Sequence, residues 1–444
     1  MYLRIVGALA EDIAAGRLHR GQMLPTHRML AHALGVDLTT VTRAYAEAHR
    51  QGLTEATVGR GTFVKGRPIG ARTTASPGID LSMNLPPQPQ QADLDVRLAK
   101  ALSDVRADAG LAAYLTYQQP GGTPTERQAA AAWLNEQLAL DVAPQRLLVT
   151  PGTQSALFAL LLALAAPGST VLTERITYPG FKSAAAAVGV RLIGVEMDDE
   201  GIVPAALDKA ARAGDANIVF LMPTMHNPTT ATMSAERRKR VATVVRRRGL
   251  TLIEDDPYTF LAPGLPPVSS LIPERTYLAA SLSKCIAPGL RMSLVVAPDQ
   301  TAAERLCGLL RATLQMPAPL MTAIAVRWMR DGTANAIVDA IRTEAAARQT
   351  IAHAALAKHA YAAHPAGHHV WLPLPGRWPA ARFAAQLQGR GLAVVTSDAF
   401  ATDQPPPNAI RLALGAAHSR TELAKALEIL AEVLDQSAPN EIVV

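Results

Sequence analysis

The chain has 444 residues, of which 49% are hydrophobic and 18% charged, so it is too long for one hydrophobic core and too apolar for a disordered chain. Its longest apolar run, about Ala156–Ala166, is well short of the roughly 20 residues that a membrane-spanning helix requires. The net charge is +6, and residues 1–67 carry nine Lys or Arg against five Asp or Glu. We therefore expect two or three domains, of which only the first has a polyanionic partner.

The chain opens with a predicted amphipathic helix, in which Ile5, Leu9 and Ile13 recur at helical spacing. Charged residues such as Arg4 and Glu11 interrupt the apolar residues of this segment. We therefore expect no signal peptide.

Two further helices are predicted around a tight turn, which is the arrangement of a helix-turn-helix. Thr26 can cap the first of them, "HRMLAHAL", and Gly35 suits the left-handed residue that ends it. Asp37 can cap the second, residues 38–49. The apolar face of the first is expected to consist of Met29, Leu30, Ala33 and Leu34.

Residues 52–64, "GLTEATVGRGTFV", predict two short strands around Gly59-Arg60-Gly61, which would form the wing of a winged helix. The alternative is a small helical cap that binds no nucleic acid. Because the local positive charge, the tight turn and the wing occur together, the DNA-binding interpretation is favoured.

The segment Tyr2–Val64 also resembles the winged helix-turn-helix of GntR-type transcription regulators, through "GRLHRGQMLPTHRMLAHALGV", "TTVTRAY" and "GRGTFV". The resemblance implies double-stranded DNA as a partner. The family usually has Ser-Arg where this chain has Asp37-Leu38, so the operator sequence does not carry over. The residues that the resemblance places near DNA are Arg28, Thr39, Thr42, Arg43, Arg60 and Gly61.

Residues 65–79 are rich in Gly, Pro, Ser, Thr and basic residues, and we expect a flexible linker that reaches on the order of 20 Å. Beyond it, strand and helix patterns alternate, so residues 80–440 predict an α/β domain with a parallel sheet covered by helices. Ligands bind such sheets at the carboxyl ends of the strands. The residues that directly follow each apolar run are therefore the candidate site.

Those residues suit pyridoxal 5'-phosphate. Pro151–Gln154 lies at a strand-to-helix junction, where free backbone N–H groups favour a phosphate. Asp255 and Lys284 follow two other strands, and Arg291 lies beyond Lys284 in "SLSKCIAPGLR". Lysine can form a Schiff base with this cofactor, a carboxylate can keep its pyridine nitrogen protonated, and arginine can meet its phosphate. Taken singly, a lysine after a strand is usually a surface residue.

The spacing of these motifs over Asp80–Gln436 is similar to that of the fold-type I aminotransferases, particularly the kynurenine and 2-aminoadipate branch. The resemblance implies that Lys284 is the Schiff-base lysine, that Asp255 pairs with the pyridine nitrogen, and that Tyr178 stacks on the ring. Asn227 and Tyr258 would bond the ring oxygen. The phosphate would be held by Thr153, Gln154, Ser281 and Arg291.

Two more roles follow from the same resemblance. Tyr117 would reach the phosphate in a neighbouring subunit, which implies a homodimer, and Arg411 would bind the carboxylate of an amino acid. The alternatives are an exposed strand position for Arg411 and ordinary core packing for Tyr178. Thr230 departs from the family, which usually has glycine in "NPTG", so the rim of the pocket differs. No metal ion is expected.

From about residue 317 to 440 the sequence predicts a smaller α/β lobe, which includes a Ser419/Glu422 capping box. The arginine clusters at 237–248 are expected on the solvated face of a helix rather than in a second nucleic-acid patch. The two cysteines, Cys285 and Cys307, cannot form a disulfide framework and fit a reducing cytoplasm.

From end to end, the chain resembles the MocR-type subfamily of GntR regulators, in which a winged helix is joined to an aminotransferase-like domain. This resemblance implies a pyridoxal phosphate-dependent transcription regulator that senses an amino compound. The alternatives are an aminotransferase with a vestigial N-terminal domain and, more remotely, a protein–protein module without cofactor. Specific DNA binding would favour the regulator, and steady turnover with a 2-oxo acid would favour the aminotransferase.

Overall fold

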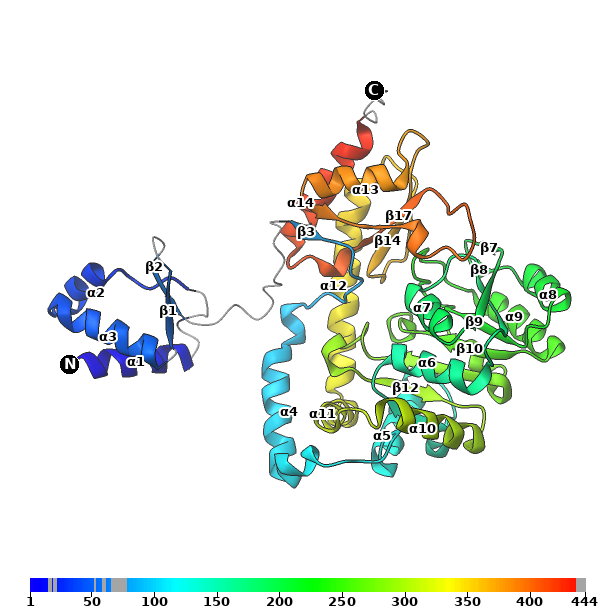
Figure 1. Cartoon of the computed structure of the whole chain (residues 1–444), viewed down its shortest axis with the longest axis horizontal. Helices are drawn as coiled ribbons and strands as arrows, with labels where there is room; N and C mark the ends of the chain where they lie inside the picture. The colour runs from blue at the N-terminus through cyan, green and yellow to red at the C-terminus, as the bar shows by residue number, and fades with distance from the viewer. Residues whose placement is uncertain (15–17, 19–21, 52, 58–60, 65–77, 437–444) are drawn as a thin grey trace. The chain divides into compact units, whose positions relative to one another are not determined.

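The structure is a computed structural model that describes residues 1–14, 18, 22–51, 53–57, 61–64 and 78–436. The chain divides into two compact units, Met1–Pro77 and Gly78–Val444 (Figure 1). Residues 65–77 of the predicted linker lie outside the described residues, and Ile79 already belongs to strand β3 (Ile79–Asp80) of the second unit.

The first unit is a winged helix-turn-helix. Helices α1 (Tyr2–Ala14), α2 (His27–Leu34) and α3 (Leu38–Arg50) precede the antiparallel hairpin of β1 (Thr54–Thr57) and β2 (Gly61–Val64). The predicted caps are confirmed. The Thr26 side chain accepts a hydrogen bond from Met29 N, the Asp37 side chain accepts one from Thr39 N, and Gly35 has the left-handed φ of 61° that ends α2.

The predicted apolar face of α2 is correct only for Leu30. Met29 is 63% exposed and Leu34 is 50% exposed, whereas Ala31 is the buried residue of this helix. The core of the unit is supplied mainly by α1, α3 and the residues beside the hairpin, and α2 adds to it only Ala31 and the partly buried Leu30. A helix of two turns can approach such a core closely through a small side chain, so its larger apolar residues remain at the surface.

The second unit is built on a seven-stranded sheet in the order β4-β12-β11-β10-β9-β5-β6. Its strands are mostly apolar and, apart from the edge strand β6, buried, as a sheet between two layers of helices requires. Strand β12 runs antiparallel to both neighbours, so the sheet is mixed rather than parallel throughout. The link between β11 and β12 is too short for a crossover helix, which explains the reversal. The strands are β4 (Leu147–Thr150), β5 (Thr170–Glu174), β6 (Arg191–Val195), β9 (Ile218–Leu221), β10 (Thr251–Asp255), β11 (Thr276–Ser281) and β12 (Ser293–Val296).

Helices cover both faces of this sheet (Figure 1). One apolar cluster joins it to α6 (Thr153–Leu164), α7 (Pro179–Ala187) and α10 (Gln300–Leu314). The clusters on the other face include α8 (Pro204–Ala213) and α9 (Ala235–Arg248) at one end of the sheet. At the other end they include α4 (Leu94–Ala109), α5 (Pro124–Leu138), α11 (Pro319–Arg330) and α12 (Thr333–Leu356).

The C-terminal lobe has an antiparallel sheet in the order β13-β14-β17-β16. Ser419 caps the last helix by accepting a hydrogen bond from Glu422 N, but the Glu422 carboxylate accepts from His418 N rather than from Ser419 N, so only half of the predicted capping box forms. Strand β3 pairs with β15, and this pairing ties the start of the unit to the lobe. The elements are β13 (Ala362–Ala363), β14 (His369–Pro373), α13 (Ala380–Gly389), β15 (Leu392–Ala393), β16 (Val395–Thr396), β17 (Ala409–Ala413) and α14 (Arg420–Asp435), with a separate hairpin of β7 (Met197–Asp198) and β8 (Gly201–Ile202).

The arginines of α9 are not all on a solvated face. Arg237 and Arg238 are buried, and their guanidinium groups donate to Asp198 and to Thr224 Oγ1, respectively. Arg248 donates to Asp208 at the other end of the helix. These arginines are therefore engaged within the unit. No helix in the described part of the chain is long and apolar enough to cross a membrane.

Candidate functional site

A cavity of about 560 Å³ opens at the carboxyl ends of β4, β10 and β11, between the large sheet and the C-terminal lobe. It contains every residue predicted to contact the cofactor within one subunit, together with Arg411. These residues come from segments up to 258 positions apart in sequence, and the fold brings them together. They are Thr153, Gln154, Tyr178, Asn227, Asp255, Tyr258, Ser281, Lys284, Arg291 and Arg411.

Lys284 follows the buried strand β11 and has a partly buried side chain. Its Nζ donates to the backbone oxygen of Asn84. Burial of the ammonium, followed by the positive charge of Arg411, lowers the pKa of Lys284 to about 8. A larger share of this amine is therefore neutral near neutral pH than in an exposed lysine, and a neutral amine is a nucleophile.

Asp255 is the last residue of β10 and is 3% exposed. Its Oδ1 is buried and has no hydrogen-bond partner among the residues that the structure describes. Burial, followed by the nearby Asp256, raises the pKa of Asp255 to about 8. A buried carboxyl without a partner is costly, and a protonated ring nitrogen placed against it would remove that cost.

Asn227 and Tyr258 lie on another wall of the cavity. The Tyr258 hydroxyl is fully buried and accepts a hydrogen bond of 2.6 Å from Asn84 Nδ2. Burial raises the pKa of Tyr258 well above its ordinary value, so the phenol stays protonated and can donate to a ligand oxygen. Thr230, at the position where glycine is usual, is buried with a left-handed φ of 65°, a strained conformation for a β-branched residue.

The predicted phosphate-binding segment at the start of α6 (the phosphate cradle) contains a glycine, Gly152, that no larger residue could replace without a clash. Gly152 has a φ of 91° and precedes Thr153, the first residue of the helix. A Cβ on Gly152 would lie only 2.6 Å from Arg291 Nη2. Arg291 and the free N–H groups at this helix end therefore approach one small space, and Ser281 lines the same cavity.

Tyr178 and Gln154 flank this cradle. Tyr178 directly precedes α7 and is partly buried, and burial, followed by the charge of Asp255, raises its pKa. Gln154 Nε2 donates to Gly180 O at 2.7 Å, which fixes the amide, while its Oε1 is buried without a partner within the described residues.

Arg411 lies on β17 of the C-terminal lobe and is 6% exposed, so it is not the exposed strand residue of the alternative interpretation. Its Nη1 donates to Asn227 Oδ1 at 2.9 Å and its Nη2 donates to Ser82 O. The guanidinium carbon lies 5.2 Å from the centre of the Phe400 ring. The group is thus preorganised inside the cavity, where it can exchange these neutral acceptors for a carboxylate.

These features fit pyridoxal phosphate. Lys284 offers an amine for its aldehyde, and the unpartnered Asp255 Oδ1 offers a carboxylate for its ring nitrogen. The cradle that a Cβ on Gly152 would fill suits its phosphate. The donor set therefore matches each polar end of the cofactor.

Sequence reasoning missed three polar residues at or beside the site, of which Asn84 lines the cavity. Asn84 contacts both Lys284 and Tyr258, although it lies 200 positions before Lys284. His368 Nε2 donates to Lys284 O at 2.7 Å, and His369 Nε2 donates to His226 O at 3.1 Å. The only signal for Asn84 was its place in "NLPP", four residues after the end of β3.

Tyr117 is not among the residues that line the cavity in this chain. It follows a short 3-10 helix, Leu111–Leu115, and is 83% exposed, next to Leu115 at 86%. An exposed tyrosine beside an exposed leucine suits contact with a second copy of the chain, so the predicted role of Tyr117 in a partner's site stays a prediction.

The first unit presents four of the six predicted DNA-contacting residues at its surface. Arg28 on α2 and Thr39, Thr42 and Arg43 on α3 are exposed, opposite the buried face of α3. The Thr39 hydroxyl donates to Asp37 and the Arg43 guanidinium lies 5.1 Å from the centre of the Tyr2 ring. Gly61 begins β2, whereas Arg60 lies outside the described residues.

Comparison with known proteins agrees with both units. Residues 1–64 match the gntR family of bacterial regulatory proteins, and residues 76–430 match the class I and II aminotransferases. The chain is 28% identical to the uncharacterized HTH-type transcriptional regulator YdeF of Bacillus subtilis, over 98% of this chain and 94% of YdeF. It is also 28% identical to the vitamin B6 salvage pathway transcriptional repressor PtsJ of Salmonella typhimurium, over 90% and 91% of the two chains.

Solved structures of aminotransferases share the fold of the second unit. An archaeal alanine:glyoxylate aminotransferase superposes with a TM-score of 0.74 at 24% identity, over 88% of this chain and 94% of that one. The α-aminoadipate aminotransferase LysN of Thermus thermophilus also gives 0.74 at 24% identity, over 80% and 92%. The chain therefore belongs to the class I and II aminotransferase family and, with its gntR-family domain, has the composition of a MocR-type regulator.

Proposed function

We propose that this protein is a transcription regulator that binds DNA through residues 1–64 and senses an amino compound through pyridoxal phosphate in the second unit. The observation that carries the proposal is that one chain combines an exposed basic helix-turn-helix face with a cavity that has a lysine, a carboxyl and a phosphate cradle. Such a regulator acts in the cytoplasm, where two free cysteines stay reduced.

The residues that the resemblance assigns to the cofactor each have a part in holding it. When bound, pyridoxal phosphate supplies an aldehyde that condenses with amines and a ring that delocalises negative charge. Lys284 Nζ would hold the aldehyde carbon, the Asp255 carboxylate would accept a hydrogen bond from the protonated ring nitrogen, and Asn227 and Tyr258 would donate to the ring oxygen. Tyr178 stacks on the ring. The phosphate is held by Thr153, Gln154, Ser281 and Arg291, with Tyr117 supplied by the other subunit of a homodimer.

The effector is an amino compound whose carboxylate binds Arg411. Its amine would take the place of Lys284 Nζ, and the freed Lys284 amine could then take up a proton. An effector changes DNA affinity only if it binds one conformation of the dimer better than another. Movement of the C-terminal lobe with Arg411 is the change that we propose for this link.

The proposal is tested by titrating the cofactor-loaded protein with a panel of amino acids and amines while recording visible absorbance and DNA anisotropy. We expect one compound to change both signals with the same midpoint. A spectral change that leaves DNA affinity constant for every compound in the panel would contradict the regulatory link.

A second function, transamination, has one specific observation in its favour. The residues that the resemblance assigns to catalysis, Lys284, Asp255 and Tyr178, all line the same cavity. Steady conversion of an amino acid and a 2-oxo acid, together with the absence of specific DNA binding, would favour an aminotransferase with a vestigial N-terminal domain.

Substitution of Gly152 by alanine is expected to weaken cofactor binding by about tenfold or more, because the added Cβ would meet Arg291 at 2.6 Å. Gly168→Ala is the matched control. Gly168 has a similar φ of 85°, but a Cβ there meets nothing within 4 Å. Equilibrium dialysis of pyridoxal phosphate against the two apo variants measures the difference. Equal losses would mean that backbone strain, and not the cradle, is responsible.

Arg411→Ala is expected to weaken the spectral response to a carboxylate-bearing effector by roughly 10- to 100-fold, as loss of a charge-assisted hydrogen bond predicts. The response to the corresponding amine without a carboxylate should change far less. Visible titrations of the wild type, Arg411→Ala and Arg411→Lys provide the comparison. An unchanged midpoint in Arg411→Ala would assign the carboxylate to another residue.

A further inference from the structure

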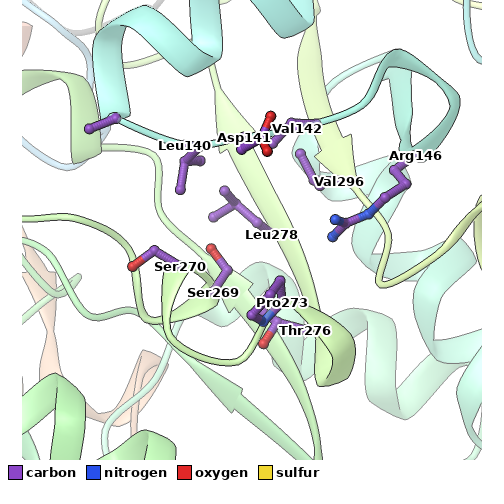
Figure 2. Close-up of a pocket in the computed structure, with 11 residues that line it drawn as sticks. Leu140, Asp141, Val142, Arg146, Ser269, Ser270, Pro273, Thr276, Leu278 and Val296 are labelled. Atoms are coloured by element: carbon purple, nitrogen blue, oxygen red, sulfur yellow. The ribbon is translucent and has the colours of Figure 1, made fainter.

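A second cavity lies at the opposite edge of the large sheet from Lys284. It measures about 380 Å³ and is lined by residues at the start of β11, the end of β12 and the loops beside them (Figure 2). Strand β11 begins at Thr276 in this cavity and ends at Ser281 in the cofactor cavity. Five residue steps of a strand span roughly 16 Å, so the two cavities are separate sites on one strand.

Two opposite charges face this cavity without forming a pair. Arg146 Nε donates to Ala297 O at 2.9 Å, which holds the side chain in place. Within the described ranges its two terminal nitrogens have no hydrogen-bond or ion-pair partner, and the exposed Asp141 carboxylate likewise has none. In Figure 2 the guanidinium extends toward Leu278, with Asp141 on another side of the same space.

A buried hydroxyl adds a third polar group. Ser269 is 8% exposed, and its backbone N–H donates to Glu254 Oε2 at 2.7 Å, which fixes the residue. Its Oγ is buried, interacts weakly with the Glu254 carboxylate and makes no hydrogen bond of ordinary geometry in the part of the chain that the structure describes. The nearby Thr276 hydroxyl, in contrast, donates to Ile272 O at 2.9 Å. A buried hydroxyl without a well-formed hydrogen bond is unfavourable, and a ligand acceptor in the cavity would supply that bond.

The floor of the cavity is apolar. Leu278 is 1% exposed and Val296 is 4% exposed, so both are rigid parts of the central sheet. The volume of about 380 Å³ is near the lower end of the roughly 300–1,000 Å³ of ligand pockets. The site therefore suits a compact molecule with one apolar side.

We infer that this cavity binds a second small ligand, a free amino acid with an apolar side chain. Its carboxylate binds the terminal nitrogens of Arg146, its ammonium binds Asp141, and its side chain covers Leu278. Ser269 Oγ donates to the carboxylate. One arginine and one aspartate match a zwitterion better than a phosphate, because Asp141 repels an anion that cannot offer a positive group. The ligand acts independently of the amino compound proposed for the Lys284 cavity.

The test uses full-length, cofactor-loaded protein with leucine as the probe. Arg411→Ala, which weakens carboxylate binding at Lys284, is the background. Calorimetry is expected to show one leucine per chain whose binding leaves the visible spectrum unchanged. Leucine analogues that lack either the amine or the carboxylate should bind at least about tenfold more weakly.

Variants of the cavity identify the site. Asp141→Asn and Arg146→Gln should each weaken this spectrally silent binding, that is, leucine binding that leaves the visible spectrum unchanged, at least about tenfold. Arg390→Gln is the control and should not weaken it, because Arg390 is an exposed arginine paired with Glu432. Ser269→Ala should weaken it severalfold, because the hydroxyl that donates to the leucine carboxylate is gone.

Absence of silent binding by leucine, or silent binding that survives both Asp141→Asn and Arg146→Gln, would overturn the inference. Neither result bears on the regulator proposal, which depends on the visible spectrum and on DNA binding. A spectral change on adding leucine in the Arg411→Ala background would assign that event to the Lys284 cavity instead.

Discussion

Lys284→Ala is expected to abolish covalent attachment of pyridoxal phosphate. Lys284 is the lysine among the residues that line the cavity, so its loss leaves no amine there to hold the aldehyde carbon. After borohydride reduction, the mass of the wild type should increase by one cofactor, whereas the mass of the variant should not. Non-covalent binding should persist in the variant, because the phosphate cradle and Asp255 remain.

Lys182→Ala is the matched control for this experiment. Burial also lowers the pKa of Lys182, but its Nζ donates to Ala399 O and Ala401 O and lies outside the cavity lining. Full labelling of this variant, with none in Lys284→Ala, would support the assignment. Labelling of Lys284→Ala at another lysine would overturn it.

The pH dependence of attachment has a definite sign. The neutral amine attacks the aldehyde, so the rate should rise with pH and level off above the lysine pKa. That pKa is lowered from 10.5 to about 8, so at pH 7.5 roughly a quarter of Lys284 is neutral, against about one in a thousand for an ordinary lysine. Arg411→Ala removes a positive neighbour and should move the inflection to higher pH. A rate that keeps rising to pH 10 in the wild type would contradict the shift.

The sequence predicted the strand-end residues because a general rule relates them to space. Parallel strands end at the same edge of a sheet, so Asp255 after β10 and Lys284 after β11 had to be close. Helix caps were equally predictable, because Asp37 and Ser419 act on backbone groups two or three residues away. Such short-range rules need no knowledge of the fold.

Contacts between distant segments could not be predicted in this way. Asn84 reaches Lys284 and Tyr258 only because the segment after β3 is carried to the cavity by the pairing of β3 with β15. Burial of Arg238 depends on the carbonyls and hydroxyl that surround α9, which no local pattern reveals. The Ser269 hydroxyl likewise has no sequence signal, since its state depends on which groups the sheet edge leaves without a well-formed hydrogen bond.

The hydrophobic periodicity of the sequence also could not predict that β12 runs antiparallel to its neighbours. A buried strand has the same apolar pattern whether it runs parallel or antiparallel to its neighbours. Only the length of the connection before it distinguishes the two directions. The reversal matters for the site. It places Ser293, the first residue of β12, beside Thr150 at the end of β4, where its Oγ accepts from the Thr153 hydroxyl at 3.2 Å.

Removal of one basic side chain from the helix-turn-helix is expected to separate DNA binding from cofactor binding. Arg28→Ala and Arg43→Ala should each weaken binding to the flanking intergenic DNA and lower the slope of log affinity against log salt by about one. Each arginine is exposed on a helix of the first unit, where it can neutralise one phosphate. The visible spectrum should not change, because the cofactor cavity belongs to the second unit.

Arg50→Ala provides the matched control on the same helix as Arg43. Its guanidinium is already engaged by Glu47, at 2.9 Å and 2.7 Å, so its loss should reduce affinity and salt slope much less. Arg43 also packs over Tyr2, and Arg43→Lys, which keeps the charge, shows whether that packing contributes. Anisotropy titrations of the full chain at several salt concentrations measure all four variants. An equal loss of DNA affinity in Arg28→Ala, Arg43→Ala and Arg50→Ala would indicate a diffuse effect of positive charge instead of a DNA-contacting face. If α2 and the outer side of α3 contact DNA, removal of an arginine that forms no ion pair must cost more affinity than removal of Arg50, which is already paired with Glu47.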